Sequence, residues 1–410
     1  MKEVTIVCLV IVVGLIIMTL SVNRLQKNAV IVDNNAEEFS TAYPNQRKLA
    51  KTSDGVLHLV YHRADSNGIL QIYHAVSKDQ GKNWSVEQVT HESADQCFPS
   101  IAIDSDNNLH LVWIEGWPSK PGIVPYVYYR KRTREGWQPR ELVAAYATYP
   151  SIAVDSHNNV HVVYGTYVYS PGYYGGGNGV RWRTKTSNGW QIEETISSDR
   201  LWARYPAIAI DSQDNVHVAW SHSTRYRYYD LHYRRKTVSG WEEEIEISRD
   251  SDSTSSIPSI AIDNNDHVHI VWHQQENASY AYATDGYWSI RHRVYTDSWQ
   301  PVEVVAGPIK YSQLYPTIAI DGKNNIHIVW YGKHPISHSF YQIRSRTYQN
   351  SWKPIQEITL LLHDQINPSL MWAFYPLING VKTNQPKEGY AFVWIDGTTI
   401  KYQSSEISQP

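Results

Sequence analysis

"PSIAIDSDNNLHLVW" occupies residues 99–113, and close copies of it return along the chain. Residues 150–164 read "PSIAVDSHNNVHVVY", residues 206–220 read "PAIAIDSQDNVHVAW", and two further copies begin at Pro258 and Pro316. Each copy alternates large and small residues, passes through an Asp- and Asn-rich stretch, and continues into an apolar run. Because Asp and Asn bond their own backbone in turns, every copy predicts two short strands joined by a tight turn.

The residues after each copy complete a repeating unit. A variable loop leads to a third strand-like segment such as "VRWRTKT", a short turn follows, and a fourth segment begins at a tryptophan. These tryptophans recur every 51 to 58 residues, at Trp84, Trp137, Trp190, Trp241, Trp299 and Trp352. Four short strands per unit of this length are typical of a β-propeller blade.

Counting the first strands gives seven blades, which start near residues 45, 98, 149, 205, 257, 315 and 367. The last blade ends before a fourth strand, while residues 28–33, "NAVIVD", form a spare strand ahead of the first blade. We therefore predict an all-β, seven-bladed propeller of four-stranded blades over residues 28–410. Its N-terminal strand is expected to complete the last blade and close the ring, which removes exposed sheet edges.

The chain begins with an apolar segment. Residues 4–22 carry no charge and are long enough to cross a bilayer or to serve as a secretory signal. Residues 1–27 are therefore interpreted as a signal peptide or membrane anchor, a hydrophobic helix with a short linker. We expect an extracytoplasmic protein, secreted or anchored, that meets the membrane only through this segment.

The composition restricts the classes of partner and cofactor. A formal net charge of −3 lacks the basic excess of a nucleic-acid binder, so no nucleic-acid partner is expected. Of the two cysteines, Cys8 lies in the apolar segment and Cys97 is left without a partner, which excludes a disulfide framework. The sequence predicts a monomer without a cofactor. With 30 Tyr and 16 Trp against 5 Phe, it is rich in aromatic side chains that suit half-exposed surfaces.

Residues 77–84, "SKDQGKNW", match the Asp-box pattern Ser-x-Asp-x-Gly-x-x-Trp through Ser77, Asp79, Gly81 and Trp84. The chain thereby resembles the BNR-repeat proteins, a propeller family that includes the sialidases. The resemblance implies that the box is a structural turn between third and fourth strands, remote from any active site. The Arg-Ile-Pro tripeptide of sialidases is absent from this chain, so no sialidase catalytic residue is carried over.

Residues that recur in every blade are better explained by packing than by one site. A histidine occupies the same place in the second strand of six blades, at His58, His110, His161, His217, His269 and His327. We interpret this row as structural hydrogen bonding and predict no metal site. Function is instead expected in the loops that differ between blades, which the strand order gathers on one face of the ring.

Aromatic and polar side chains at the edges of those loops are the candidate ligand-binding residues, because a carbohydrate site requires such groups. From strand ends they are His62, Arg63, Glu115, Tyr167, His222, His273, Lys333 and Asp396, and from the loops between blades they are Tyr149, Arg204, Tyr205 and Tyr315.

Two catalytic arrangements can be drawn from this set. Glu115 and Asp396 could act as an acid/base pair. Alternatively, His222 or His273 could abstract a proton together with a tyrosine.

Three functions remain open. We favour an extracytoplasmic propeller that binds carbohydrate or another surface ligand, a glycan or a surface protein, without turnover. The alternative is a carbohydrate-active enzyme, either a divergent sialidase-like glycoside hydrolase or a polysaccharide lyase. A second alternative is a platform for protein–protein docking. A propeller fold alone does not choose among them.

Overall fold

The computed structural model describes residues 29–37, 40–41, 43, 45–116, 123–170, 173–176, 179–198, 203–225, 228–248, 254–276, 287–307, 312–333, 341–359, 372–374, 391–396 and 398–404. These residues form strands, turns and loops, with no helix among them. Accordingly, the described part of the chain holds no helix that could span a membrane. The apolar segment 4–22, predicted as a helix, lies outside the described residues.

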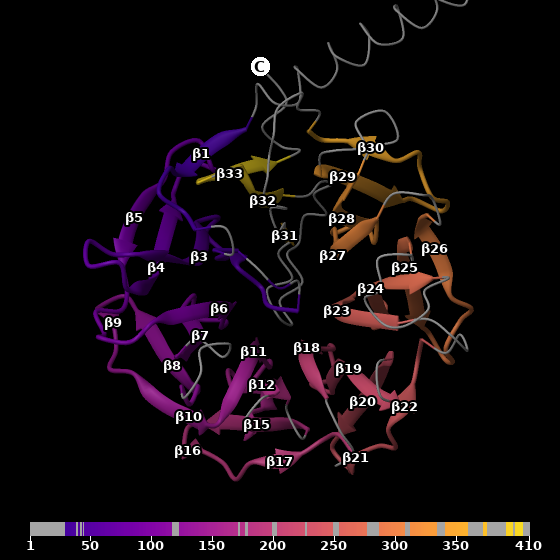
Figure 1. Ribbon diagram of the computed structural model, residues 1–410, viewed down its shortest axis with the longest axis horizontal. Coiled ribbons are helices and arrows are strands. Elements are labelled where there is room, and N and C mark those ends of the chain that lie inside the picture. The colour runs from indigo at the N-terminus through magenta and orange to yellow at the C-terminus, as the bar shows by residue number, and fades with distance from the viewer. Residues whose placement is uncertain are drawn as a thin grey trace, which may run out of the picture.

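Seven four-stranded antiparallel sheets surround a central axis (Figure 1). The inner strands are β2 (Leu49–Lys51), β6 (Gln96–Ile103), β11 (Ala147–Val154), β18 (Arg204–Ile210), β23 (Thr254–Ile262), β27 (Gln313–Ile320) and β31 (Trp372–Phe374). The second strands are β3 (Leu57–Ala64), β7 (Leu109–Glu115), β12 (Val160–Thr166), β19 (Val216–Arg225), β24 (Val268–Glu276), β28 (Ile326–Lys333) and β32 (Ala391–Asp396).

The third strands are β4 (Leu70–Ser77), β8 (Tyr126–Thr133), β15 (Val180–Thr186), β20 (Tyr228–Thr237), β25 (Tyr287–Tyr295), β29 (Tyr341–Tyr348) and β33 (Thr399–Ser404). The outer strands are β5 (Ser85–Gln88), β9 (Gly136–Trp137) with β10 (Glu141–Ala145), β16 (Gly189–Trp190) with β17 (Glu194–Thr195), β21 (Gly240–Trp241) with β22 (Ile245–Glu246), β26 (Glu303–Ala306), β30 (Gln356–Glu357) and β1 (Val30–Asp33). A separate hairpin of β13 (Val168–Ser170) and β14 (Tyr173–Gly176) extends from blade three.

The N-terminal strand closes the ring. β1 pairs antiparallel with β33, with Val30 opposite Tyr402, so the last blade is built from both ends of the propeller. The carboxylate of Asp33 also accepts hydrogen bonds from Tyr61 and from Arg63 Nη1, the latter at 2.6 Å, which ties β1 to blade one. The predicted seven-bladed propeller and its closure are thus confirmed.

The core lies between neighbouring blades. One buried cluster joins Val163 and Trp182 of blade three to Ile208, Val218 and Trp220 of blade four, and similar clusters fill other junctions. The aromatic residue near the end of the second strand is fully covered in these junctions, as Trp220 shows with 0% exposure. Burying such large side chains stabilises the ring by excluding apolar surface from water.

The repeated turns hold their shape through side-chain hydrogen bonds. Asp104 accepts from the backbone N–H of Asn108 at 2.7 Å, and its other oxygen lies 3.0 Å from His110 Nε2. Equivalent Asp–His contacts of 3.0 to 3.2 Å occur at His161, His217 and His327. The structural interpretation of the histidine row is therefore confirmed at these positions.

The Asp-box forms the turn between β4 and β5. Ser77 Oγ donates to Asp79 and accepts from the N–H of Gly81, each at 2.8 Å, and Trp84 Nε1 donates to the carbonyl of Gly81 at 3.1 Å. The Trp84 ring packs on Tyr402 of the last blade at 5.2 Å. The turn of blade one therefore braces the blade at which the ring closes.

Candidate functional site

In blades one to six, the residue before the opening proline has an unusual backbone conformation. Six residues that directly precede a proline have positive φ, namely Tyr43 (72°), Phe98 (53°), Tyr149 (50°), Tyr205 (56°), Ile257 (52°) and Tyr315 (52°). This backbone region is rare for bulky residues and persists only where surrounding structure holds it. In blades two to six, the pairing register of the inner and second strands shifts across this residue, which makes it a β-bulge.

Four of these side chains form an aromatic cluster in the channel. The rings of Tyr43 and Phe98 lie 4.9 Å apart, Tyr43 and Tyr149 also 4.9 Å, and Tyr149 and Tyr205 4.5 Å. Because they come from blades one to four, these contacts place the rings at the centre. Burial raises the pKa of Tyr149 well above its usual value, so its hydroxyl is a neutral hydrogen-bonding group.

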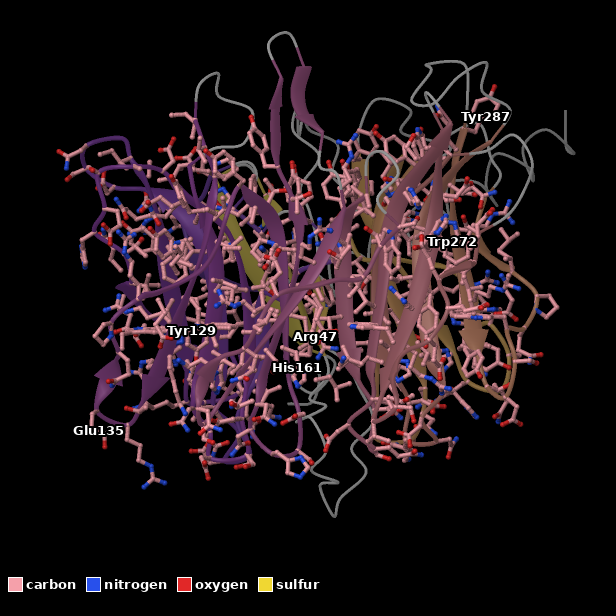
Figure 2. The ribbon with its side chains drawn as sticks, turned by 90° about the horizontal axis from the view of Figure 1, so that it is seen from below. Arg47, Tyr129, Glu135, His161, Trp272 and Tyr287 are labelled. Atoms are coloured by element: carbon pink, nitrogen blue, oxygen red, sulfur yellow. The ribbon has the colours of Figure 1, made fainter. Side chains whose placement is uncertain are left out.

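Residues 45–48, the plug segment, lie in the channel, and Figure 2 shows Arg47 in the middle of the molecule. Gln46 Nε2 donates to the carbonyls of Phe98 at 3.0 Å and Pro150 at 2.9 Å, and Asn45 Nδ2 donates to that of Pro206 at 2.9 Å. The channel edge of each inner strand has no neighbouring strand, so the plug supplies donors that these carbonyls would otherwise lack. That residues 45–48 fill the channel was not predicted from the sequence.

Two of the candidate histidines support the bulges. His273 Nδ1 accepts from the N–H of Tyr315 at 3.2 Å, and His62 Nδ1 lies 3.5 Å from the N–H of Phe98. Burial lowers the pKa of each imidazole to about 3, so both are neutral at pH 7. At the same position in blade four, Ser221 Oγ accepts a hydrogen bond from the N–H of Ile257 at 2.9 Å. This position in the second strand is therefore a structural hydrogen-bond acceptor.

The two candidate carboxylates have separate partners. Glu115 Oε2 pairs with Arg140 Nη1 at 2.6 Å, and that guanidinium lies 4.3 Å above the ring of Tyr128. Asp396 pairs with Lys401 in the last blade. The acid/base pairing of Glu115 with Asp396 stays a prediction.

Arg63 lines an outer groove rather than the channel. Its guanidinium pairs with Asp33 and lies 3.9 Å above the ring of Tyr73. These residues line a groove of about 580 Å³ between β1 and the first blade. Arg63 therefore serves the closure of the ring and stands apart from the channel residues.

Arg204 stands at the channel mouth on blade four. One of its Nη atoms hydrogen-bonds the hydroxyl of Tyr229, and its guanidinium lies 4.9 Å from the Tyr229 ring and 5.6 Å from the Tyr205 ring. Tyr205 in turn belongs to the channel cluster. A half-buried guanidinium held between two aromatic rings is suited to a carboxylate or a sugar ring, because planar donors and stacking faces meet there. Sequence reasoning found Arg204 and Tyr205 but missed Tyr229.

The other side of blade four carries a second cluster. His222 Nδ1 and His232 Nδ1 lie 3.3 and 2.6 Å from Glu244 Oε1, and 3.4 Å from each other. Among the described residues, these three form the one group of metal-ligating side chains whose donor atoms all lie within 4.8 Å. Only His222 was predicted. His232 stands where the third strands of the other blades have Arg, Tyr or Lys, and this difference was the available signal.

The remaining candidates are placed only in part. Tyr167 is buried at 5% exposure, and its N–H donates to the carbonyl of Tyr146 at 2.6 Å. Of Lys333 only the backbone, at the end of β28, is described. Much of the predicted loop surface, residues 117–122, 277–286 and 334–340, lies outside the described residues.

No family model matches the chain, and no curated protein matches its sequence. Solved structures do match. An ulvan lyase, described as a new family of polysaccharide lyase and bound to -[GlcA(1-4)Rha3S]-, has a TM-score of 0.64 at 12% identity, covering 91% of this chain and 94% of that chain. The α-L-arabinofuranosidase Arb93A of Fusarium graminearum has a TM-score of 0.55 at 10% identity, covering 93% and 99%. A protein of unknown function from Dyadobacter fermentans has 0.53 at 12% identity, covering 77% and 95%. At these identities the likeness concerns the propeller fold.

Proposed function

We propose that this propeller binds an acidic carbohydrate at the mouth of its channel, on the face that bears the variable loops, outside the cytoplasm. The observation that carries the proposal is the arrangement of Arg204 between the rings of Tyr205 and Tyr229. A guanidinium matches the carboxylate of a uronic acid with two parallel hydrogen bonds, and the rings offer faces on which a sugar packs.

Two further facts support a saccharide over another ligand. The propellers of similar fold include one bound to a saccharide that contains GlcA, and an arabinofuranosidase. In addition, the rings of Tyr149 and Tyr43 pack on Tyr205, so further aromatic side chains adjoin the ring that contacts Arg204. The expected partner is therefore a glycan that carries carboxylates, and we expect the protein to bind it as a monomer.

The test compares binding of uronic-acid-containing and neutral polysaccharides by calorimetry, using the wild type, Arg204→Ala and Arg134→Ala. Arg134 is the matched control, because it carries the same charge in an exposed turn on the opposite face. Loss of a charge-assisted hydrogen bond worth about 1.5–3 kcal/mol should weaken acidic-glycan binding roughly 10- to 150-fold in Arg204→Ala alone. Equal affinity for neutral glycans, or equal affinity of the two variants, would show that Arg204 does not recognise a carboxylate.

Cleavage of such a glycan is the second candidate function. Elimination from a uronic acid needs a cation on the carboxylate, a base for the neighbouring C–H proton and an acid for the leaving oxygen. Arg204 in contact with Tyr229 supplies the cation and one group able to exchange a proton. Mass spectrometry of the same incubations separates the two functions, since a lyase releases fragments with an unsaturated end and a binding protein leaves the glycan intact.

A further inference from the structure

Blades three and six each hold an arginine–glutamate pair beside their third and fourth strands. In blade three Arg181 lies 3.6 Å from Glu193, and in blade six Arg344 lies 2.6 Å from Glu357. Each arginine sits opposite the large aromatic residue of its second strand, Tyr164 or Trp330. These are permanent ion pairs at the junction between blades.

Blade four fills this position differently. His232 is opposite Trp220, as Arg344 is opposite Trp330, so the histidine stands where blades three, five and six have an arginine. Glu244 supplies the carboxylate, and His222, two residues after Trp220, adds a second imidazole. Two imidazoles and one carboxylate thus lie beside the strands where blades three and six hold a guanidinium and a carboxylate.

The three donor atoms converge on one point. The distance between the two Nδ1 atoms is 3.4 Å, and His222 Nδ1 lies 3.3 Å from Glu244 Oε1. Tetrahedral ligands about 2.0–2.1 Å from a zinc ion are separated by roughly 3.3 Å, so both distances already fit. The third distance, 2.6 Å between His232 Nδ1 and Glu244 Oε1, is that of a hydrogen bond and would open slightly around an ion.

The other His–His–Glu groups among the described residues do not converge. In blade one His74 Nε2 contacts His58 at 2.9 Å, while its Nδ1 contacts Glu87 at 2.8 Å. In blade five His292 likewise uses both ring nitrogens, toward His269 at 3.1 Å and Glu303 at 3.0 Å. In these two linear hydrogen-bonded groups, the middle imidazole lies between the other histidine and the glutamate. The three side chains therefore do not direct their ligand atoms at one point.

The surroundings hold the blade-four ligands in place. The side chains of His222, His232 and Glu244 are only 5%, 11% and 16% exposed. The N–H of Ser198, from blade three, donates to Glu244 Oε2 at 2.7 Å, and its hydroxyl lies 3.4 Å from Oε1, the oxygen that contacts the imidazoles. Such hydrogen bonds to the second oxygen are a common support for a carboxylate that binds a metal ion.

We propose that His222, His232 and Glu244 bind a divalent transition-metal ion, with zinc as the best match. Two imidazoles and one carboxylate are a recognised zinc ligand set, and they disfavour calcium and magnesium, which take oxygen ligands. Three protein ligands leave one position for water or another small ligand. The site is distinct from the carbohydrate site proposed at Arg204, and neither proposal depends on the other.

The test measures zinc binding to the chelator-treated full-length chain by competition with a chromophoric chelator. Wild type is compared with Glu244→Gln and His232→Gln, and with Glu303→Gln as the control, since Glu303 ends the non-converging chain of blade five. Wild type and Glu303→Gln should bind one zinc ion per chain. Glu244→Gln and His232→Gln should bind more than about 100-fold more weakly, because even supporting partners of metal ligands contribute 10- to 100-fold.

Cobalt substitution of the wild type gives a second result that does not require the variants to fold. A tetrahedral site of this kind should show visible absorption bands in proportion to one equivalent of Co²⁺, and zinc should remove them. Absence of a 1:1 cobalt spectrum, or zinc affinity that is unchanged in folded Glu244→Gln, would overturn the proposal. The cluster would then be a histidine version of the ion pairs in the other blades.

Discussion

Replacing Gly81 by alanine should loosen the junction at which the propeller closes. Gly81 has φ +88°, and a Cβ added there would meet the Tyr402 ring, with Cδ1 and Cζ both at 2.7 Å. Tyr402 is 2% exposed and lies on β33, opposite Val30 of the closing strand β1. The ring cannot move away without disturbing the pairing between the two ends of the propeller.

Two separate costs are expected at this position. An alanine in the left-handed region costs about 1 kcal/mol relative to glycine. Overpacking against Tyr402 adds about 1–3 kcal/mol, for a total loss of about 2–4 kcal/mol in the free energy of unfolding. Gly189→Ala is the matched control, because Gly189 has φ +93° and an added Cβ would meet nothing within 4 Å. It should cost only the backbone term of about 1 kcal/mol.

The assay is equilibrium unfolding in urea, followed by tryptophan fluorescence, for both variants in the wild-type and Tyr402→Ala backgrounds. In the wild type, Gly81→Ala should be less stable than Gly189→Ala by about 1–3 kcal/mol. With the ring of Tyr402 removed, that difference should vanish, because the coupling between the two positions is the overlap itself. Equal losses for the two glycines in the wild type, or a difference that survives in Tyr402→Ala, would refute this account of the Asp-box turn.

Three further outcomes follow from the channel and the closure. The pKa of His273 is about 3 in the folded protein and about 6.5 in the unfolded chain, so the unfolded chain binds more protons between these values and the free energy of unfolding falls as the pH falls through them. In urea titrations at pH 7 and pH 5, His273→Gln should therefore lose about 2 kcal/mol less stability than the wild type between the two pH values. The same loss in both proteins would contradict the assignment. Gln46→Leu should cost about 2–4 kcal/mol, since two channel carbonyls lose their donor, whereas the exposed Gln138→Leu should change the urea midpoint little. Removing residues 1–35 should leave β33 as an open edge and produce oligomers in size-exclusion chromatography; a stable monomer would show that β1 is dispensable.

The sequence was sufficient to predict the ring because the information that builds it is local. Each copy of the repeat carries its own alternation, its own Asp–Asn turn and its own tryptophan, so the strands could be counted without knowing how blades pack. The missing fourth strand and the spare segment at residues 28–33 then required each other, and β1 pairs with β33 as predicted.

The centre of the ring was harder to predict because its contacts join distant blades. The plug donates from Gln46 to carbonyls 52 and 104 residues away. The sequence did contain one signal of the plug. Thr52 begins the turn of blade one as Asp104 begins the turn of blade two, yet Thr52 lies eight positions after Pro44, whereas Asp104 lies five positions after Pro99. The first copy of the repeat therefore carries extra residues. The structural role of His273 was missed, and it was predicted as a candidate base. Its hydrogen-bond partner is the backbone N–H of Tyr315 in the next blade, and a pattern of side chains does not reveal such a partner.

A propeller provides its own internal controls, and these separate structural from functional polar residues in this molecule. His62, Ser221 and His273 take the same bond at the same position in three blades, so their chemistry is explained by the bulge they support. Blade four departs from the repeat on both of its sides, with Arg204 and Tyr229 on one and His232 and Glu244 on the other. Packing between blades does not require the histidine–glutamate cluster, because blades three and six hold arginine–glutamate pairs beside the corresponding strands. Blade four is therefore where binding and metal chemistry should be sought first, and a loss confined to one side would show that its two sites act independently.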